Sequence, residues 1–294
     1  MDFYANLHLH STHSDGALTP EELVITAKNE GYKALAITDH DTATAYPELK
    51  EACQKHGMDC IFGTEFSVTE PYGTHLVAFH YDPEYPEMKK YLADMAEVTV
   101  VTTKGCFDEA VEKGNISGIT WQEVLDYNKG IAWLCNNHVF RAMKAKGLVE
   151  ENEYMAWFLK NFRDQRRKYK PDFNYLALSE MIDLVHRAGG IAIVAHPDKN
   201  HFDNIEQIVG WGLDGIEAEH PDLNREQRDK ALELAKKYKL LISGGSDHSG
   251  LCSGLYGSYP NEEELKKSHT YIEPLSCGTS YEYYMEIKNR NTNR

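Results

Sequence analysis

The sequence predicts an α/β protein in which strand–helix units form a parallel barrel interrupted by a helical insertion. Short apolar strands alternate with amphipathic segments up to residue 84, and the alternation resumes after residue 172. Between these stretches the strand signals fade and helical periodicity takes over. A chain of 294 residues is long enough to bury one such core and to carry an insertion.

The first part of the chain has clear signals for the ends of its elements. Residues 4–10 alternate as a strand does, and Thr19-Pro20-Glu21-Glu22 predicts a helix start with a capping box and proline at the first helical position. That helix is expected to end near Gly31. The other elements expected here are a strand over 34–38, a helix over 47–56, and strands over 60–67 and 75–79.

The middle of the chain, residues 85–172, is expected to be the helical insertion. Residues 121–127 and 139–146 have helical periodicity, and Pro171 marks the return to the barrel. The run over residues 161–170 mixes Lys and Arg with aromatic residues. We interpret this run as a solvated helix face and not as a binding patch.

Alternation of strands and helices returns in the last third. Helices are expected over 179–188, over 203–209 and from Asn224, where Gln227 completes a capping pattern, with strands over 191–195, 215–219 and 240–245. About seven short strands separated by helices favour a parallel barrel over an open sheet.

Charge and cysteine usage narrow the possible functions. The formal net charge of −15 argues against non-specific binding of duplex DNA, which needs many Lys and Arg contacts to phosphate. A small phosphorylated substrate is compatible with this charge if bound metal ions supply positive charge locally. The six cysteines show no Cys-x-x-Cys spacing, and the sequence shows no signal peptide and no membrane-spanning run. We therefore expect reduced thiols, no membrane partner and a cytoplasmic location.

Histidine and carboxylate residues recur near the ends of the expected strands. His8 and His10 are two apart on one strand, so their side chains point to the same side. In a parallel barrel, reactive residues collect at the carboxyl ends of strands and in the loops that follow. The other candidates near such positions are Asp15, His40, Glu65, His75, His196, His220, Asp247 and His248.

These residue types predict a metal centre. Histidine and carboxylate without cysteine suit zinc, manganese or iron. Three or four ligands fill one site, so this many candidates indicate two or three divalent ions with a bridging carboxylate. Such a cluster lowers the pKa of bound water and clamps phosphoryl oxygens. We therefore expect a metal-dependent phosphoesterase that acts through a metal-activated hydroxide.

Seven short segments together resemble the polymerase and histidinol phosphatase (PHP) family. They are His8-Leu9-His10, Ser14-Asp15-Gly16, residues 36–41, Gly63-Thr64-Glu65, residues 194–197, residues 215–218 and residues 244–247. The resemblance covers roughly residues 1–80 and 174–255. It implies a distorted (β/α)7 barrel whose first part is residues 1–84, an insertion over 85–172, and a second part with a C-terminal tail over 173–294.

The resemblance also implies a role for each candidate. One ion would be held by His8, His10, Glu65 and Asp247, a second by Glu65, His75 and His196, and a third by Asp15 and His40 with His248. Asp247 and His196 are the expected catalytic residues. Relatives usually read Ser-Asp-x-His-Gly near the end, whereas Ser246-Asp247-His248-Ser249-Gly250 places the histidine one position earlier. On a regular strand this shift would send the imidazole of His248 to the other side.

Within this family, the chain resembles the phosphoesterases that carry a helical insertion in the barrel. Those members act on nucleoside 3′,5′-bisphosphates or trim short RNA from its 5′ end. A nucleotide or short RNA is therefore the expected substrate. Asn136-Asn137-His138 stands where relatives usually read Arg-Pro-His, so a bidentate phosphate donor is missing. The expected substrate contacts are His138, Arg141 and His220.

Three alternatives stay open at this point. A histidinol phosphatase would share the metal centre and differ only in substrate. A metal-dependent amidohydrolase would also activate water on a barrel, but those enzymes commonly add a carboxylated lysine, and no lysine stands at an expected strand end. The third is a metal-holding or nucleotide-sensing module, against which the near-complete ligand set argues. No feature of the sequence indicates an oligomeric state.

Overall fold

The strands form two sheets in the computed structural model, which describes residues 3–69, 75–248 and 277–290. A parallel three-stranded sheet has the order β1 (Ala5–Asn6), β2 (Ala34–Leu35) and β3 (Asp59–Cys60). A five-stranded sheet has the order β4 (Gly63–Ser67), β5 (His75–Phe79), β6 (Ile191–Val194), β7 (Gly215–Glu219) and β8 (Leu241–Gly244). The α/β class is confirmed.

The expected all-parallel order is wrong, because β5 runs antiparallel to both β4 and β6. Residues 68–74 alone connect β4 to β5, and a parallel pair needs a crossover of about a dozen residues or more. Within the described residues the two sheets do not close into one hydrogen-bonded barrel. Single bridges join them instead, between His40 and Glu65 and between Leu9 and His248.

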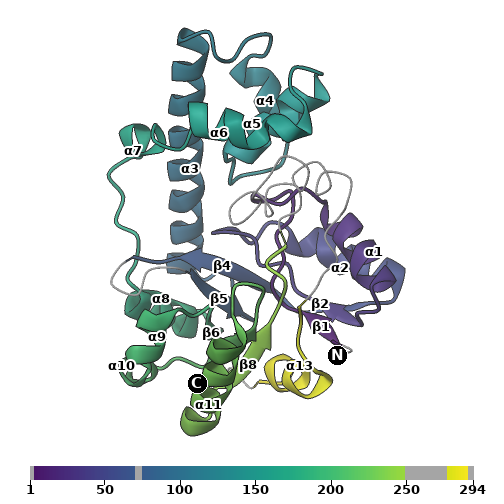
Figure 1. The fold of residues 1–294 in the computed structure, drawn as a ribbon, viewed down its shortest axis with the longest axis vertical. Coiled ribbons are helices and arrows are strands. Elements are labelled where there is room, and N and C mark those ends of the chain that lie inside the picture. The colour runs from purple at the N-terminus through teal and green to yellow at the C-terminus, as the bar shows by residue number, and fades with distance from the viewer. Residues whose placement is uncertain (1–2, 70–74, 249–276, 291–294) are drawn as a thin grey trace.

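Helices cover the outer faces of both sheets (Figure 1). α1 (Pro20–Asn29) and α2 (Tyr46–His56) share an apolar cluster with the three-stranded sheet, and α8 (Leu178–Arg187) and α11 (Arg225–Tyr238) share one with the five-stranded sheet. The capping box predicted for α1 is present, since the Glu22 amide donates to Thr19 Oγ1 at 3.3 Å and the Thr19 amide donates to Glu22 Oε2 at 2.8 Å. The short helices α9 (Lys199–Asp203) and α10 (Ile205–Gly210) precede β7.

Residues 85–172 contain helices and no strand, and the structure describes all of them. The elements are α3 (Pro86–Glu112), α4 (Trp121–Tyr127), α5 (Asn136–Ala145), η1 (Glu151–Glu153), α6 (Tyr154–Asn161) and α7 (Arg166–Tyr169). Their own apolar cluster is built on aromatic side chains such as Phe107, Phe140 and Phe158. The long helix α3 joins both parts, because Met88 near its start packs in the cluster of the five-stranded sheet. The basic run over 161–170 is not one continuous helix.

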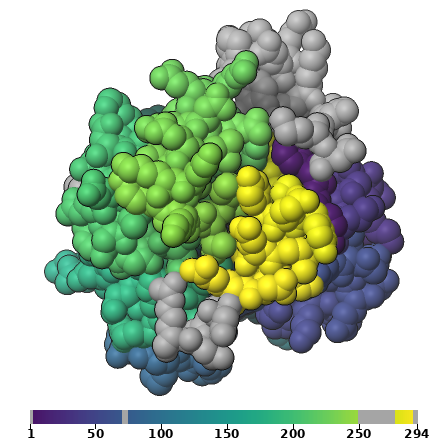
Figure 2. Space-filling view, turned by 90° about the horizontal axis from the view of Figure 1, so that it is seen from below, coloured from purple at the N-terminus to yellow at the C-terminus, as the bar shows by residue number. Residues whose placement is uncertain are grey.

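The end of the chain packs against its beginning. Thr279 bridges Ala5, and the rings of Tyr4 and Tyr281 meet edge to face with centroids 5.0 Å apart. The helix α13 (Tyr281–Lys288), which the sequence did not predict, therefore lies beside the N-terminal segment and β8 (Figure 2). Ser249 and Cys252 lie outside the described residues.

Two smaller expectations concern cysteines and membranes. Cys53, Cys60, Cys106 and Cys135 form no disulfide bond in the described part of the chain. None of the helices in the described ranges has the length and apolar character needed to cross a bilayer. The division of the chain at residues 84 and 172 and the cytoplasmic location stay predictions.

Candidate metal centre

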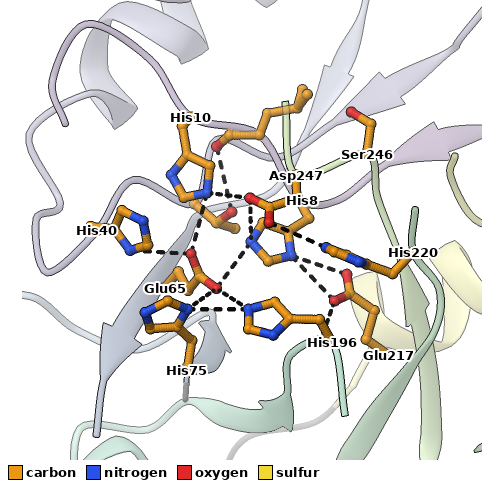
Figure 3. Close-up of polar contacts among 12 residues, drawn as sticks. His8, His10, His40, Glu65, His75, His196, Glu217, His220, Ser246 and Asp247 are labelled. Atoms are coloured by element: carbon orange, nitrogen blue, oxygen red, sulfur yellow. Dashed lines mark hydrogen bonds and ion pairs between the residues drawn. The ribbon is translucent and has the colours of Figure 1, made fainter. Parts of the chain in front are cut away.

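A single buried carboxylate, Glu65 on β4, lies at the centre of the site and is 1% exposed (Figure 3). Histidine nitrogens surround both of its oxygens. Oε1 lies 3.2 Å from His8 Nε2, 3.0 Å from His75 Nδ1 and 3.1 Å from His196 Nε2, and Oε2 lies 3.2 Å from both His10 Nε2 and His40 Nδ1. Side chains far apart in the sequence therefore converge on one carboxylate.

The strand directions explain this convergence. His8 and His10 follow β1, His40 follows β2 and His196 follows β6, so these side chains come from the carboxyl ends of parallel strands. His75 begins its strand instead of ending it. Because β5 runs antiparallel to its neighbours, its amino end lies at the same edge as their carboxyl ends. The reversed strand therefore delivers His75 to the same site.

Asp247 adds a second carboxylate to the cluster. Its Oδ1 lies 2.8 Å from His10 Nε2 and 3.5 Å from His8 Nε2, and its Oδ2 lies 3.3 Å from His220 Nε2. Asp247 and His196 both have left-handed backbones, with φ of 51° and 27°. Such conformations are strained for residues other than glycine and persist where the surroundings hold them. Here the Asp247 amide donates to the His8 carbonyl at 2.9 Å, and the His196 amide donates to Glu217 Oε2 at 2.8 Å.

Asp15 lies at the edge of the cluster. One carboxylate oxygen is 3.7 Å from His10 Nδ1 and the other is 4.0 Å from His40 Nε2. Asp39 anchors the loop that carries Asp15, because its carboxylate accepts from the hydroxyls of Ser11 at 2.6 Å and of Ser14 at 2.5 Å.

Four groups of side chains have donor atoms close enough together to hold an ion. They are His8, His10, Glu65 and Asp247; His40, Glu65 and His75; His10, Asp15 and His40; and His8, Glu217 and His220. Several buried nitrogen and oxygen atoms of these groups lie near other polar atoms but form no well-oriented hydrogen bond in the described part of the chain, namely His8 Nε2, His10 Nδ1, His40 Nδ1 and Glu65 Oε2. Leaving such atoms without a hydrogen bond costs stability. A bound cation would satisfy them, so the donor set fits divalent metal.

The charges of the cluster favour ionised carboxylates. Burial alone would raise the pKa of Glu65, but His75, His8 and His40 hold it well below its usual value. Burial lowers the pKa of His40 to about 4, so this imidazole is neutral and can bind metal. Burial alone would also lower the pKa of His8, but Glu65, Glu217 and Asp247 raise it well above its usual value. His8 must therefore lose a proton before it can bind an ion.

Comparisons with known proteins show the family of the chain. The family model described as the PHP domain matches residues 6–288. The chain belongs to the PHP family. The predicted family is therefore confirmed.

Two curated proteins and one solved structure are similar to most of the chain. A 5′-3′ exoribonuclease of Haemophilus influenzae is 31% identical over 258 residues, which cover 84% of this chain and 90% of the relative. A 3′,5′-nucleoside bisphosphate phosphatase of Chromobacterium violaceum is 28% identical over 288 residues, which cover 92% and 93% of the two chains. A solved structure named as a metal-dependent phosphoesterase, from Bifidobacterium adolescentis, superposes with a TM-score of 0.73 at 29% identity and covers 96% of this chain and 94% of that one. The predicted class, a metal-dependent phosphoesterase, is confirmed.

Glu217 is a site residue of this PHP-family chain that the sequence analysis did not single out. It is 2% exposed on β7, and its Oε1 lies 3.1 Å from His8 Nδ1. The segment 215–218 was among the family-like motifs, but no role was given to its acidic residue. The sequence held one signal for this residue: Glu217 is an acidic residue within a family-like strand segment. Alternation along β7 places it on the same side of the strand as Gly215.

Three other predicted site residues, His248, His138 and Arg141, do not belong to the cluster of possible metal ligands. His248 lines the cavity, but none of the possible ligand groups in the described part of the chain includes it. His138 and Arg141, expected to contact substrate, do not line the cavity. His138 Nε2 lies 3.1 Å from the Thr12 carbonyl, and Arg141 donates to the carbonyls of Thr12 and Gly16. Both side chains thus join α5 to the loop that carries Asp15.

Side chains of the cluster line a cleft of about 850 Å³. This volume is near the upper end of the range for small-molecule sites, about 300–1,000 Å³. His10, Asp15, His40 and Asp247 line the cleft together with Trp133 of the helical part. A substrate larger than a single phosphate group therefore has room beside the cluster.

Proposed function

We propose that this PHP-family chain hydrolyses a phosphate ester of a nucleotide or a short oligonucleotide at the Glu65 cluster. The observation that carries the proposal is the ring of histidine nitrogens around both oxygens of one buried carboxylate. The names of the two relatives, a bisphosphate phosphatase and an exoribonuclease, support the nucleotide class. The two sheets and the bridges between them support a distorted barrel around this cluster.

The donor groups suggest how ions would be shared. His8, His10, Glu65 and Asp247 would hold one ion, and Glu65 with His75 and His196 a second. Asp15 and His40 would hold a third together with His10. Manganese, zinc and iron suit these nitrogen and oxygen ligands. When bound, such ions lower the pKa of water and neutralise charge on the phosphate.

Neighbouring hydrogen-bonding groups set the proton positions of His220 and His8. The Asp222 amide donates to His220 Nδ1 at 3.1 Å, so a neutral His220 carries its proton on Nε2, which faces Asp247. His220 and Asp247 together can therefore hold the proton that the leaving alcohol needs. Similarly, His8 Nδ1 donates to Glu217, so once His8 has lost its second proton the free lone pair is on Nε2, beside Glu65 and Asp247.

The proposal is tested with purified protein loaded with Mn²⁺. The substrates are adenosine 3′,5′-bisphosphate, a 5′-phosphorylated RNA trinucleotide, histidinol phosphate and a phosphate-free cyclic amide. We expect turnover of the first or second, loss of turnover on chelation, and loss of bound metal and activity in His10→Ala. The matched control is His56→Ala, which removes an imidazole of α2 that pairs with Glu21 of α1. This variant should keep both the bound metal and the activity of wild type.

Other outcomes would contradict the proposal. Turnover of histidinol phosphate alone, or of the cyclic amide alone, would replace it by one of the two alternative enzymes. Full activity of His10→Ala would remove the cluster from catalysis, whatever the substrate.

A further inference from the structure

One wall of the cleft is basic, and the proposed hydrolysis at Glu65 leaves it without a role. Arg166 and Arg167 of α7 and Lys170 just after it line the same cavity as the metal cluster. Arg166 and Lys170 are four residues apart, so they lie on the same side of that turn. The interpretation of residues 161–170 as a solvated helix face is therefore wrong in part, because three of these basic residues line the cleft.

Lys168, the basic neighbour of these three residues on α7, differs from them in its contacts. Lys168 forms an ion pair with Glu109 of α3 at 3.1 Å. Arg166, Arg167 and Lys170 form no ion pair with any carboxylate in the described ranges. The chain has 46 acidic residues against 31 basic ones, so three cations on one wall without an acidic partner are a local reversal of the overall charge.

Aromatic rings support two of these basic side chains. The Lys170 Nζ lies 3.8 Å from the centroid of the Tyr175 ring, which also lines the cleft, and the Arg166 guanidinium lies 5.1 Å from the Phe158 ring. Such contacts favour positions of the cation over the ring. They leave guanidinium and ammonium hydrogens available, and these groups bind phosphate oxygens strongly.

The cleft therefore carries two groups of opposite character. Carboxylates and imidazoles, including Asp15 and Asp247, line it together with the basic residues Arg166, Arg167 and Lys170. A substrate with a single phosphate would use only the metal cluster. A substrate with a second phosphate could also place that group against the basic wall.

We propose that Arg166, Arg167 and Lys170 form a subsite for a second phosphate of the substrate. The enzyme would then prefer nucleotides that carry two phosphate groups, or short oligonucleotides, over phosphate monoesters with one. This inference rests on the proposed hydrolysis at the Glu65 cluster and names its substrate class more narrowly. The second phosphate is either a terminal group, as in a nucleoside bisphosphate, or a diester of an RNA backbone.

The test compares two triple variants that lose the same charge. Arg166→Ala/Arg167→Ala/Lys170→Ala removes the basic wall. Lys129→Ala/Lys160→Ala/Arg163→Ala removes three exposed basic side chains of the helical part that do not line the cleft. With Mn²⁺ bound, kcat/KM is measured for adenosine 3′,5′-bisphosphate, a 5′-phosphorylated RNA trinucleotide and adenosine 5′-monophosphate.

The expected result is a change in selectivity. In the basic-wall variant, the ratio of kcat/KM for the bisphosphate or trinucleotide to that for the monophosphate should fall at least about tenfold, since one charge-assisted contact is worth roughly that factor or more. The control variant should keep the wild-type ratio. A fall for the bisphosphate alone identifies a terminal phosphate, and a fall for the trinucleotide alone identifies a backbone diester. An unchanged ratio in the basic-wall variant overturns the subsite.

A binding measurement separates the subsite from the hydrolysis. Fluorescence anisotropy measures binding of a 3′-labelled, 5′-phosphorylated RNA trinucleotide to the metal-free protein, with unlabelled adenosine 3′,5′-bisphosphate as competitor. The basic-wall variant should bind more weakly, with a shallower dependence of affinity on salt than the control variant. If wild type hydrolyses none of the esters but still shows this difference, the subsite stands and the proposed hydrolysis fails. Equal binding of both variants overturns the subsite even if hydrolysis is observed.

Discussion

The Glu65 cluster and the helix α5 were both marked by histidine motifs, yet the structure places their side chains very differently. His8, His10 and His75 meet at one carboxylate although they come from separate strands. His138 on α5 is fully buried against the loop that carries Asp15, outside the cavity lining. A strand end fixes both the edge and the side on which a residue lies. The side that a helix presents depends on what packs against it.

The largest expected effect is at the centre of the cluster. Glu65→Gln removes the charge that five imidazoles face, and we expect phosphoesterase activity and bound metal to fall at least about 100-fold, more than for a residue that only orients a ligand. Glu226→Gln, on the exposed start of α11, is the control. Metal content and steady-state kinetics measure the effect. Wild-type metal content in Glu65→Gln would show that the carboxylate is structural only.

Glu217 gives the next effect, and it tests a residue that acts through His8. Glu217→Gln keeps the shape and an oxygen for the His196 amide but weakens the hold on His8 Nδ1. We expect metal affinity to fall about 10- to 100-fold. Titration of metal-free protein with Mn²⁺ measures this. An affinity equal to that of wild type would mean that Glu217 does not orient His8.

The contrast with α5 is sharpened by Arg141→Ala. If Arg141 anchors the loop at Thr12 and Gly16, the free energy of unfolding should fall by about 1–3 kcal/mol, because buried carbonyls lose a charged donor. KM should then change little. Lys144→Ala on the same helix, whose ammonium pairs with Glu151 at the surface, is the control. A raised KM with unchanged unfolding would instead support the predicted substrate contact.

The smallest effect is a pH dependence of the metal-free protein. The raised pKa of His8 and His10 means that their protonated forms stabilise the fold. This stabilisation is complete below about pH 6.5, the ordinary value, and is lost as the pH rises through the raised pKa. Urea unfolding with a chelator should therefore show decreasing stability above pH 6.5. Mn²⁺ should reverse the trend, since metal binds deprotonated imidazole. No pH dependence in the chelated protein would contradict this charge arrangement.

Several site residues could be proposed from the sequence because local patterns determine where they stand. The His8-x-His10 spacing on a strand and the strand-final position of His40 and His196 follow from alternation and from apolar runs that end in polar residues. The capping box at Thr19 is equally local. These features depend on a few neighbouring residues, so a single sequence reveals them.

Other features depended on contacts between distant segments. The antiparallel direction of β5, the burial of Glu217 against His8, the anchoring of the Asp15 loop by Arg141 and the basic wall at Arg166 each join residues far apart in the chain. The sequence alone determined which residues could serve as metal ligands, because chemistry and strand period belong to the residues themselves. Only the tertiary structure decided which of them meet and which face the cleft, because burial and pairing free energies depend on the segments that pack against them.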